Sequence, residues 1–89
     1  MRLKSGFVLE EVGGTFLAVA VGERAEEMQV LIKLNSTGAF LWKILAEREV
    51  CELDLVKALL DEYEVSPEVA EKSVSDFVKA LSSGGLIDG

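Results

Sequence analysis

The chain has 89 residues, enough for a single domain spanning residues 1–89, and it carries 16 acidic against 9 basic side chains, for a net charge of −7. This balance argues against nucleic acids and anionic membranes as partners, because binding to either relies on lysine and arginine. With no histidine and with Cys51 as its one cysteine, the sequence excludes an imidazole relay, an intrachain disulfide and a cysteine-rich zinc site, so we expect no metal and no cofactor.

The first third of the chain is predicted to form three strands. Residues 7–12 and 15–21 are joined by two glycines, which suit a tight hairpin turn with positive φ at both central positions. Residues 15–21 are apolar on both faces, a pattern typical of a central strand or of an interface. The charged residues 22–27 are expected to form a solvated loop, and residues 29–34 alternate as a half-buried third strand.

The rest of the chain has helical periodicity. We expect a first helix over residues 35–46, a second over 53–62, and a third that opens at Ser66 and Pro67 and ends at two glycines. The residues predicted to face the core are Thr37, Leu41, Ile44 and Leu45 in the first helix, Leu53, Val56, Leu59, Leu60 and Tyr63 in the second, and Ala70, Ser73, Val74, Phe77, Ala80 and Leu81 in the third. Leu86 and Ile87 are expected to fold back as an apolar clip.

Three strands followed by three helices indicate an α+β domain with helices packed on one face of an antiparallel sheet. The longest apolar run, residues 16–21, is far too short to cross a bilayer. The apolar stretch near the N-terminus stops at Glu10, too soon for a signal peptide. We therefore expect a cytoplasmic protein.

No group of residues in the sequence has the pattern of a catalytic site. The acidic residues are spaced as solvated helix faces, whereas a general acid needs burial or a close like charge to raise its pKa. Cys51 lies where the second helix should begin, a position that can lower the pKa of a thiol. Because no base is in view and Glu49 and Glu52 would oppose a thiolate, we interpret Cys51 as a small apolar filler and predict that the protein is not an enzyme.

The most informative segment is residues 34–42, which leaves a strand and caps a helix at once. Gly38 falls in the first turn of that helix, where glycine costs up to about 1 kcal/mol relative to alanine. We interpret Gly38 as a site of close backbone approach at a tight strand-to-helix joint, in preference to a direct ligand contact.

The motif Leu34-Asn35-x-Thr37-Gly38-x-x-Leu41-Trp42 resembles the signature of PqqD-like proteins, the RiPP recognition elements. The segments 6–9, 59–65 and 76–87 are also similar to that family, so the resemblance covers residues 6–87. Cys51 departs from the pattern, because the family more often has a capping threonine there.

This resemblance implies a winged-helix-like domain that binds peptide without catalysis. Family members grip the leader segment of a ribosomally synthesised precursor peptide and present it to a modifying enzyme, often a radical-SAM protein. The leader adds as a strand beside the third strand, over a groove walled by the third helix.

The sequence pattern independently supports strand addition. If the first two predicted strands pair with each other, the third lies at an edge of the sheet with unpaired backbone groups. On the third helix, short side chains beside the buried stripe would leave room for a guest, and two lysines on its outer face could pair with acidic leader residues. The candidate peptide-binding residues are Gln29, Val30, Leu31, Ile32, Lys33, Glu71, Lys72, Ser75, Val78, Lys79 and Ser82.

Two alternatives remain open from the sequence. The first is a homodimeric scaffold or regulatory subunit with another protein partner, which the doubly apolar second strand favours. The second is a winged-helix nucleic-acid binder. The composition of the third helix disfavours it, because Glu68, Glu71 and Asp76 outnumber Lys72 and Lys79, whereas a recognition helix normally carries a basic excess.

Overall fold

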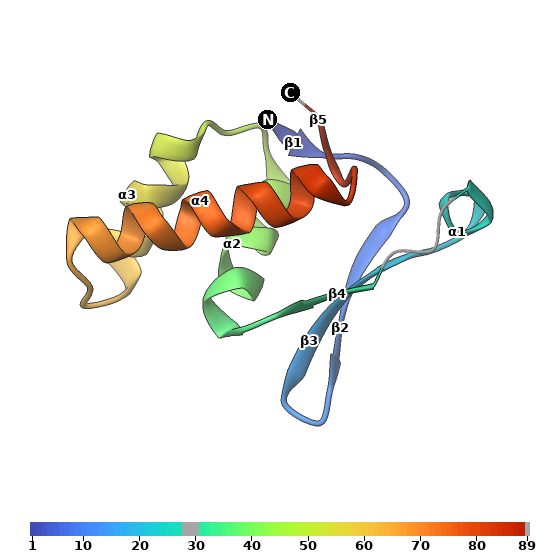
Figure 1. Ribbon diagram of the computed structural model, residues 1–89, viewed down its shortest axis with the longest axis horizontal. Helices are drawn as coiled ribbons and strands as arrows, with labels where there is room; N and C mark the ends of the chain where they lie inside the picture. Colours follow the sequence, from blue (N-terminus) through green and yellow to red (C-terminus); the bar gives the residue numbers. More distant parts are fainter. Residues whose placement is uncertain (28–30, 89) are drawn as a thin grey trace.

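A computed structural model describes residues 1–27 and 31–88, and it confirms an α+β arrangement (Figure 1). Three strands form an antiparallel sheet in the order β2-β3-β4, and three helices follow it in the chain. The strands are β2 (Phe7–Val12), β3 (Thr15–Ala20) and β4 (Leu31–Leu34), and the helices are α2 (Ser36–Glu47), α3 (Glu52–Glu62) and α4 (Pro67–Ser83).

The predicted hairpin joins β2 to β3. Gly13 and Gly14 both have positive φ, 57° and 82°, and the strands continue in register from Val12 opposite Thr15. Positive φ at both central residues matches the right-handed twist of the flanking strands, and glycine adopts it without steric cost. The strand that is apolar on both faces, β3, is central as expected, because it pairs with β2 on one side and β4 on the other.

The expectation of a loop over residues 22–27 is wrong, because the structure has a short helix there, α1 (Glu23–Glu27). Its Arg24 makes contacts that are distant in sequence: Nε donates to the carbonyl oxygen of Ser5 at 3.0 Å, and the guanidinium lies 5.5 Å from the centroid of the Phe7 ring. The guanidinium also forms an ion pair with Glu27 at 3.3 Å. A charged pentapeptide carries no apolar period, so these contacts are invisible to pattern analysis.

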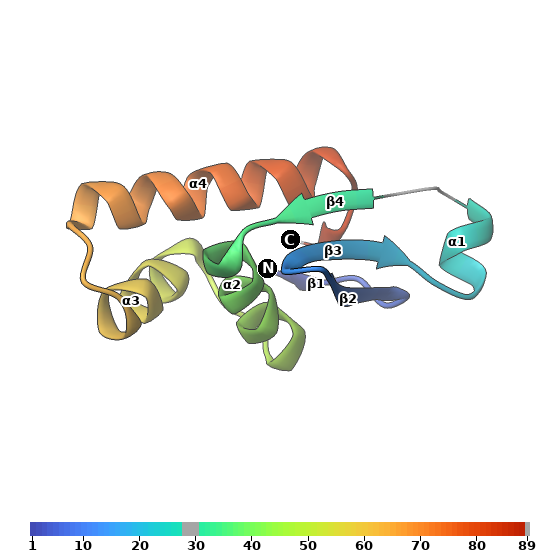
Figure 2. The ribbon, with the colours of Figure 1, turned by 90° about the horizontal axis from the view of Figure 1, so that it is seen from below.

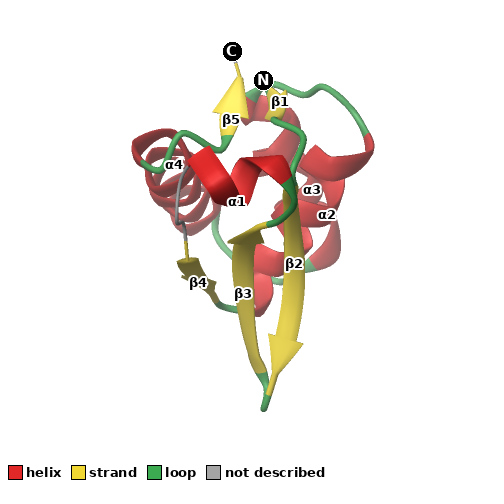
Figure 3. Ribbon diagram, turned by 90° about the vertical axis from the view of Figure 1, so that its right-hand side faces the viewer, coloured by secondary structure: helices red, strands yellow, loops and turns green. Residues whose placement is uncertain are grey.

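The two ends of the chain meet in a second, two-stranded sheet that the sequence analysis did not predict. In it, β1 (Arg2–Leu3) pairs antiparallel with β5 (Ile87–Asp88), and Figure 3 shows the two strands side by side. The backbone N–H of Lys4 donates to the carbonyl of Leu86 at 2.8 Å, and the Leu86 side chain is fully buried. The expected apolar clip over residues 86–87 is therefore confirmed, with β1 as its partner.

The core lies between the sheet and the helices, and leucine dominates it. In α4 the predicted stripe is confirmed at its centre, although Ala80 is exposed. In α2 the inner side is formed by Leu41, Leu45, Ala39 and Trp42, whereas Thr37 and Ile44 are only half-buried. The largest fully buried side chains are Leu41, Leu45, Leu55, Leu59, Val74, Leu81 and Leu86.

The predicted inner face of α3 is confirmed at Leu59, which is buried, and at Val56 and Tyr63, which are half-buried against the core, but it is wrong at its other two positions. Leu55, which the sequence analysis left out, is fully buried, whereas Leu53 and Leu60 are 58% and 38% exposed. Both stripes of leucines have helical spacing, and the choice between them is made by the packing of α3 against α4. No helix in the described residues is long and apolar enough to cross a membrane.

Cys51 takes part in capping the N-terminus of α3. Its backbone N–H donates to the Asp54 carboxylate at 3.1 Å, and its thiol lies 3.4 Å from the same oxygen. The backbone bond, followed by the thiol bond, holds the pKa of Asp54 below its ordinary value of 3.8. Because Cys51 is exposed, its interpretation as a small apolar filler is wrong, and these contacts give it a capping role.

We predict that Leu55→Ala lowers the free energy of unfolding by about 2–5 kcal/mol, because it opens a cavity at a fully buried site. The matched control is Leu53→Ala on the same helix, which should change it by no more than about 0.5 kcal/mol. Urea denaturation of the two variants measures both values. A larger loss for Leu53→Ala would contradict the observed phase of α3.

The Asp54 cap predicts a pH dependence of stability. Because the folded-state pKa lies below the unfolded value, the stabilisation by Asp54 is fully present above about pH 5 and is lost as the pH falls through the folded pKa. The difference in Tm between the wild type and Asp54→Ala should therefore stay constant above this range and shrink below pH 3.8. A difference that is unchanged at low pH would contradict the cap.

Candidate functional site

The strand β4 lies at an edge of the three-stranded sheet. It pairs only with β3 among the described residues, with Leu31 opposite Val19 and Leu34 opposite Phe16. In an antiparallel strand, alternate residues direct their N–H and C=O groups to opposite sides. The far side of β4 therefore presents backbone donors and acceptors that no other described strand satisfies.

Three of the predicted peptide-binding residues, Leu31, Ile32 and Lys33, lie on β4, whereas Gln29 and Val30 fall outside the described residues. Leu31 is 68% exposed and Lys33 is exposed, while Ile32 is half-buried. The strand therefore has an inner face directed at the core, an outer face directed at solvent, and a free edge between them.

The helix α4 runs beside β4, as Figure 2 shows, and a cavity of about 280 Å³ lies between them. From the strand side and the start of α2 it is lined by Lys33, Leu34, Gly38 and Leu41, among others. The wall that α4 contributes consists of Ser73, Asp76, Phe77 and Ala80. We call this cavity the β4–α4 groove.

The strand-to-helix joint at residues 34–38 fixes one end of the groove. The Asn35 side chain caps α2 by accepting a hydrogen bond from the Gly38 N–H at 2.8 Å. A Cβ atom at Gly38 would lie 3.3 Å from both the Leu34 side chain and the Asn35 Oδ1 atom, tighter than most real contacts. The tight strand-to-helix joint expected at Gly38 is therefore present, although the atoms that approach it belong to side chains and not to the backbone. Gly38 also lines the groove, so the structure does not test a ligand contact there.

The α4 residues chosen from the sequence lie elsewhere on the helix. Glu71 and Ser75 line a separate pocket of about 230 Å³ with Leu53 and Val56 of α3, and not the β4–α4 groove. Val78 and Ser82 share that flank by their helical spacing from Glu71 and Ser75. This flank is therefore not the one that lines the β4–α4 groove, and the binding role expected for it stays a prediction. The two flanks of the buried stripe are equivalent in sequence, and only the packing distinguishes them.

The two predicted lysines of α4 also lie outside the groove lining. Lys72 forms an ion pair with Asp76 at 3.4 Å, in which both side chains are mostly exposed, so the pair adds little stability. It does place a cation next to Asp76 in the groove wall. Lys79 is exposed on the outer side of α4. The groove therefore combines an apolar floor, from Leu41 and Phe77, with a charged rim.

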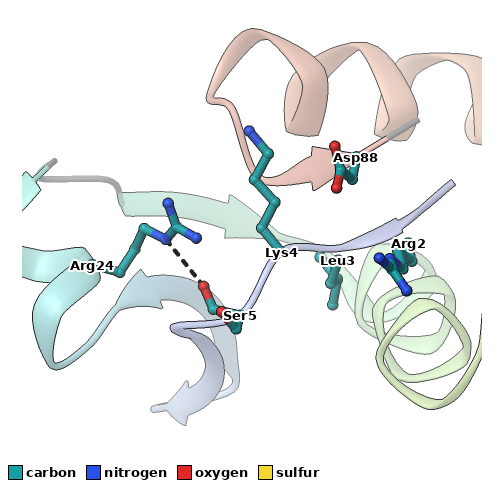
Figure 4. Close-up of a pocket in the computed structure, with 6 residues that line it drawn as sticks. All are labelled: Arg2, Leu3, Lys4, Ser5, Arg24 and Asp88. Atoms are coloured by element: carbon teal, nitrogen blue, oxygen red, sulfur yellow. Dashed lines mark hydrogen bonds between the residues drawn. The ribbon is translucent and has the colours of Figure 1, made fainter.

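A larger cavity of about 580 Å³ lies at the two-stranded sheet, lined by Arg2, Lys4, Arg24 and Asp88 among others (Figure 4). Although it is basic, the Arg24 guanidinium is already engaged by Ser5 and Glu27. Within residues 1–27 and 31–88, no cluster of three or more His, Cys, Asp or Glu side chains could hold a metal ion. Among the described residues, this cavity therefore has no cluster of side chains suited to a metal ion.

Two solved structures have the same fold as this chain, each at 21% sequence identity. One is "TbiB1 in Complex with the TbiA(beta) Leader Peptide", with a TM-score of 0.73 over 100% of this chain and 96% of that one. The other is "Lasso peptide synthetase B1 complexed with the leader peptide", with a TM-score of 0.68 over 96% and 93%. No curated protein matches the sequence.

The family comparison covers nearly the whole chain and confirms the resemblance found in the sequence. The model of "Coenzyme PQQ synthesis protein D (PqqD)" matches residues 5–87. This range includes the hairpin, the joint at Gly38, the helices α2, α3 and α4, and every residue that lines the β4–α4 groove. The chain therefore belongs to the PqqD family.

Proposed function

We propose that this protein binds the leader segment of a ribosomally synthesised precursor peptide and presents it to a modifying enzyme, such as a radical-SAM protein. In this proposal the leader adds as a strand to the free edge of β4, beside α4, and the protein itself catalyses no reaction. The observation that carries the proposal is the unpaired edge of β4 next to the β4–α4 groove.

Family membership and the fold support this function. The two solved structures described above are both complexes with leader peptides, and they share the fold of this chain. An exposed apolar edge is normally an aggregation hazard that proteins cover or charge. In β4, Leu31 is 68% exposed, so a guest strand that shields this edge accounts for its apolar character.

The energetics require both the edge and the groove. A backbone hydrogen bond contributes only about 0.5–1.5 kcal/mol net, and the described part of β4 has four residues. Backbone pairing alone therefore gives weak binding that does not depend on the guest sequence. Affinity and specificity must come from side chains that enter the groove on the α4 side.

We therefore assign the peptide contacts to Leu31, Ile32 and Lys33 on β4 and to the groove-lining flank of α4, which contains Ser73, Asp76, Phe77 and Ala80. Gln29 and Val30, which lie outside the described residues, remain predicted contacts. Contacts from Glu71, Ser75, Val78 and Ser82 would require a peptide on the opposite flank, facing α3.

Two further proposals accompany this function. We propose that the protein acts in the cytoplasm, where precursor peptides are synthesised and modified. We also propose a second copy of this chain as a partner, because β3 is apolar on both faces. A nucleic-acid partner is disfavoured by the net charge of −7.

The groove assignment predicts that Ala80→Trp weakens leader binding by at least about tenfold, because the indole would fill the space beside β4. Ser82→Trp, on the opposite flank of the same helix, serves as the matched variant and should change the affinity less than about twofold. Isothermal titration with a synthetic leader peptide, from the precursor encoded beside this gene, measures both affinities.

Both positions are exposed, so we expect each variant to fold. Circular dichroism checks this expectation. The opposite result, in which Ser82→Trp loses binding and Ala80→Trp keeps it, would transfer the site to the α3 side of the helix. No binding to the wild-type protein at peptide concentrations up to about 1 mM would reject the proposed function itself.

A further inference from the structure

One face of the three-stranded sheet is directed away from α2, α3 and α4. Residues directly opposite one another on neighbouring antiparallel strands point their side chains to the same face. Ala18 and Leu34 are buried on the inner face, next to the core. The other face, which we call the outer sheet face, therefore carries the alternate residues of each strand: Val8, Glu10 and Val12 of β2, Thr15, Leu17 and Val19 of β3, and Leu31 and Lys33 of β4.

The outer sheet face is largely apolar and accessible. Val12 and Leu31 are 58% and 68% exposed, and Val8 is 38% exposed. In Figure 3, β2 and β3 lie in front of α2, α3 and α4, so that these helices are behind the sheet. Contiguous exposed apolar surface of this kind usually marks an interaction site.

The charges on this face form a specific pattern. One cross-strand row reads Glu10, Leu17, Lys33 from β2 to β4, and the next row reads Val8, Val19, Leu31. The first row thus places an acid at one edge, a base at the other and a leucine between them. The described part of the outer face is neutral overall, although the chain carries a net charge of −7.

We propose that the outer sheet face binds a second copy of itself, around a two-fold axis that runs parallel to β3. Such an axis places β2 of one copy over β4 of the other, because it exchanges the two edges of the sheet. Glu10 then lies opposite the partner's Lys33, twice in the dimer. Leu17 packs against its own equivalent, and Val8 packs against the partner's Leu31.

This self-complementarity favours a second copy over a different protein as the occupant. Two chains of charge −7 repel each other, and a neutral face with paired charges is where that repulsion is smallest. A sheet of three strands, with up to six residues in each, measures only about 20 Å by 14 Å. This area is smaller than that of a permanent interface, so we infer a weak dimer that depends on protein concentration.

The dimer would leave the other surfaces of the sheet free. The free edge of β4 and the β4–α4 groove lie beside and behind the outer face, so each copy retains its own groove. The inference therefore does not rest on the proposed leader binding, and either one can fail without the other.

A charge exchange tests the two-fold arrangement. Glu10→Lys and Lys33→Glu each place like charges opposite one another twice, so each variant alone should remain monomeric at concentrations where the wild type dimerises. An equimolar mixture of the two variants should dimerise again, because every opposing pair then regains opposite signs. Sedimentation velocity up to about 1 mM protein measures the mass in each case. The control is Glu11→Lys, which lies on the inner side of the same strand and should dimerise like the wild type.

Three results would overturn the proposal: a wild type that is monomeric throughout this range, single variants that still dimerise, or a mixture that fails to regain the dimer. Circular dichroism of each variant, together with the regained dimer in the mixture, separates a lost contact from a lost fold. A leader titration of Glu10→Lys addresses peptide binding separately, because Glu10 does not line the groove.

Discussion

The unpaired backbone edge of β4, held beside α4, is the constraint on which the account depends. Two local features create it. The hairpin at Gly13 and Gly14 uses one side of β3 for β2, which leaves the other side for β4. The joint at Asn35 and Gly38 then turns the chain into α2 immediately, so that no further strand extends the sheet on that side within the described chain.

The four described residues of β4 face three surroundings: the core, the solvent and the groove. Ile32 and Leu34 face the core, where Ile32 lies close to the end of α4 and Leu34 supports the strand-to-helix joint. Leu31 and Lys33 face outward, and the backbone edge faces the groove. A strand this short can divide its roles in this way because its side chains alternate strictly between the faces. As a result, the proposed leader pairing uses the backbone edge of the strand, whereas the proposed self-association uses its outward side chains, and Lys33 borders both surfaces.

Much of the fold was predictable because its signals are local. The two glycines indicated the hairpin, and the change of period near Asn35 and the serine–proline pair at Ser66 marked the starts of α2 and α4. What pattern analysis missed depends on contacts distant in sequence. The pairing of β1 with β5 involves only two residues in each strand, and α1 is held in part by Arg24 contacting Ser5 and Phe7.

The candidate site was predictable in its strand and not in its helix. The edge position of β4 followed from the expected pairing of the first two strands. The flank of α4 that lines the groove, with Ser73 and Ala80, has no signal in the sequence, because a buried helical stripe has two equivalent borders. The same ambiguity affected α3, where Leu53 and Leu55 both fit a helical period and only packing selects Leu55.

Hydrogen exchange of the β4 backbone, measured with and without a synthetic leader peptide, tests the central claim most directly. Unpaired edge amides exchange rapidly, and a guest strand protects them by pairing. The account predicts that alternate amides within Leu31–Leu34 become slow to exchange when the leader binds, while the edge amides of β2 are unaffected. Tight leader binding with no added protection anywhere along β4 would contradict it.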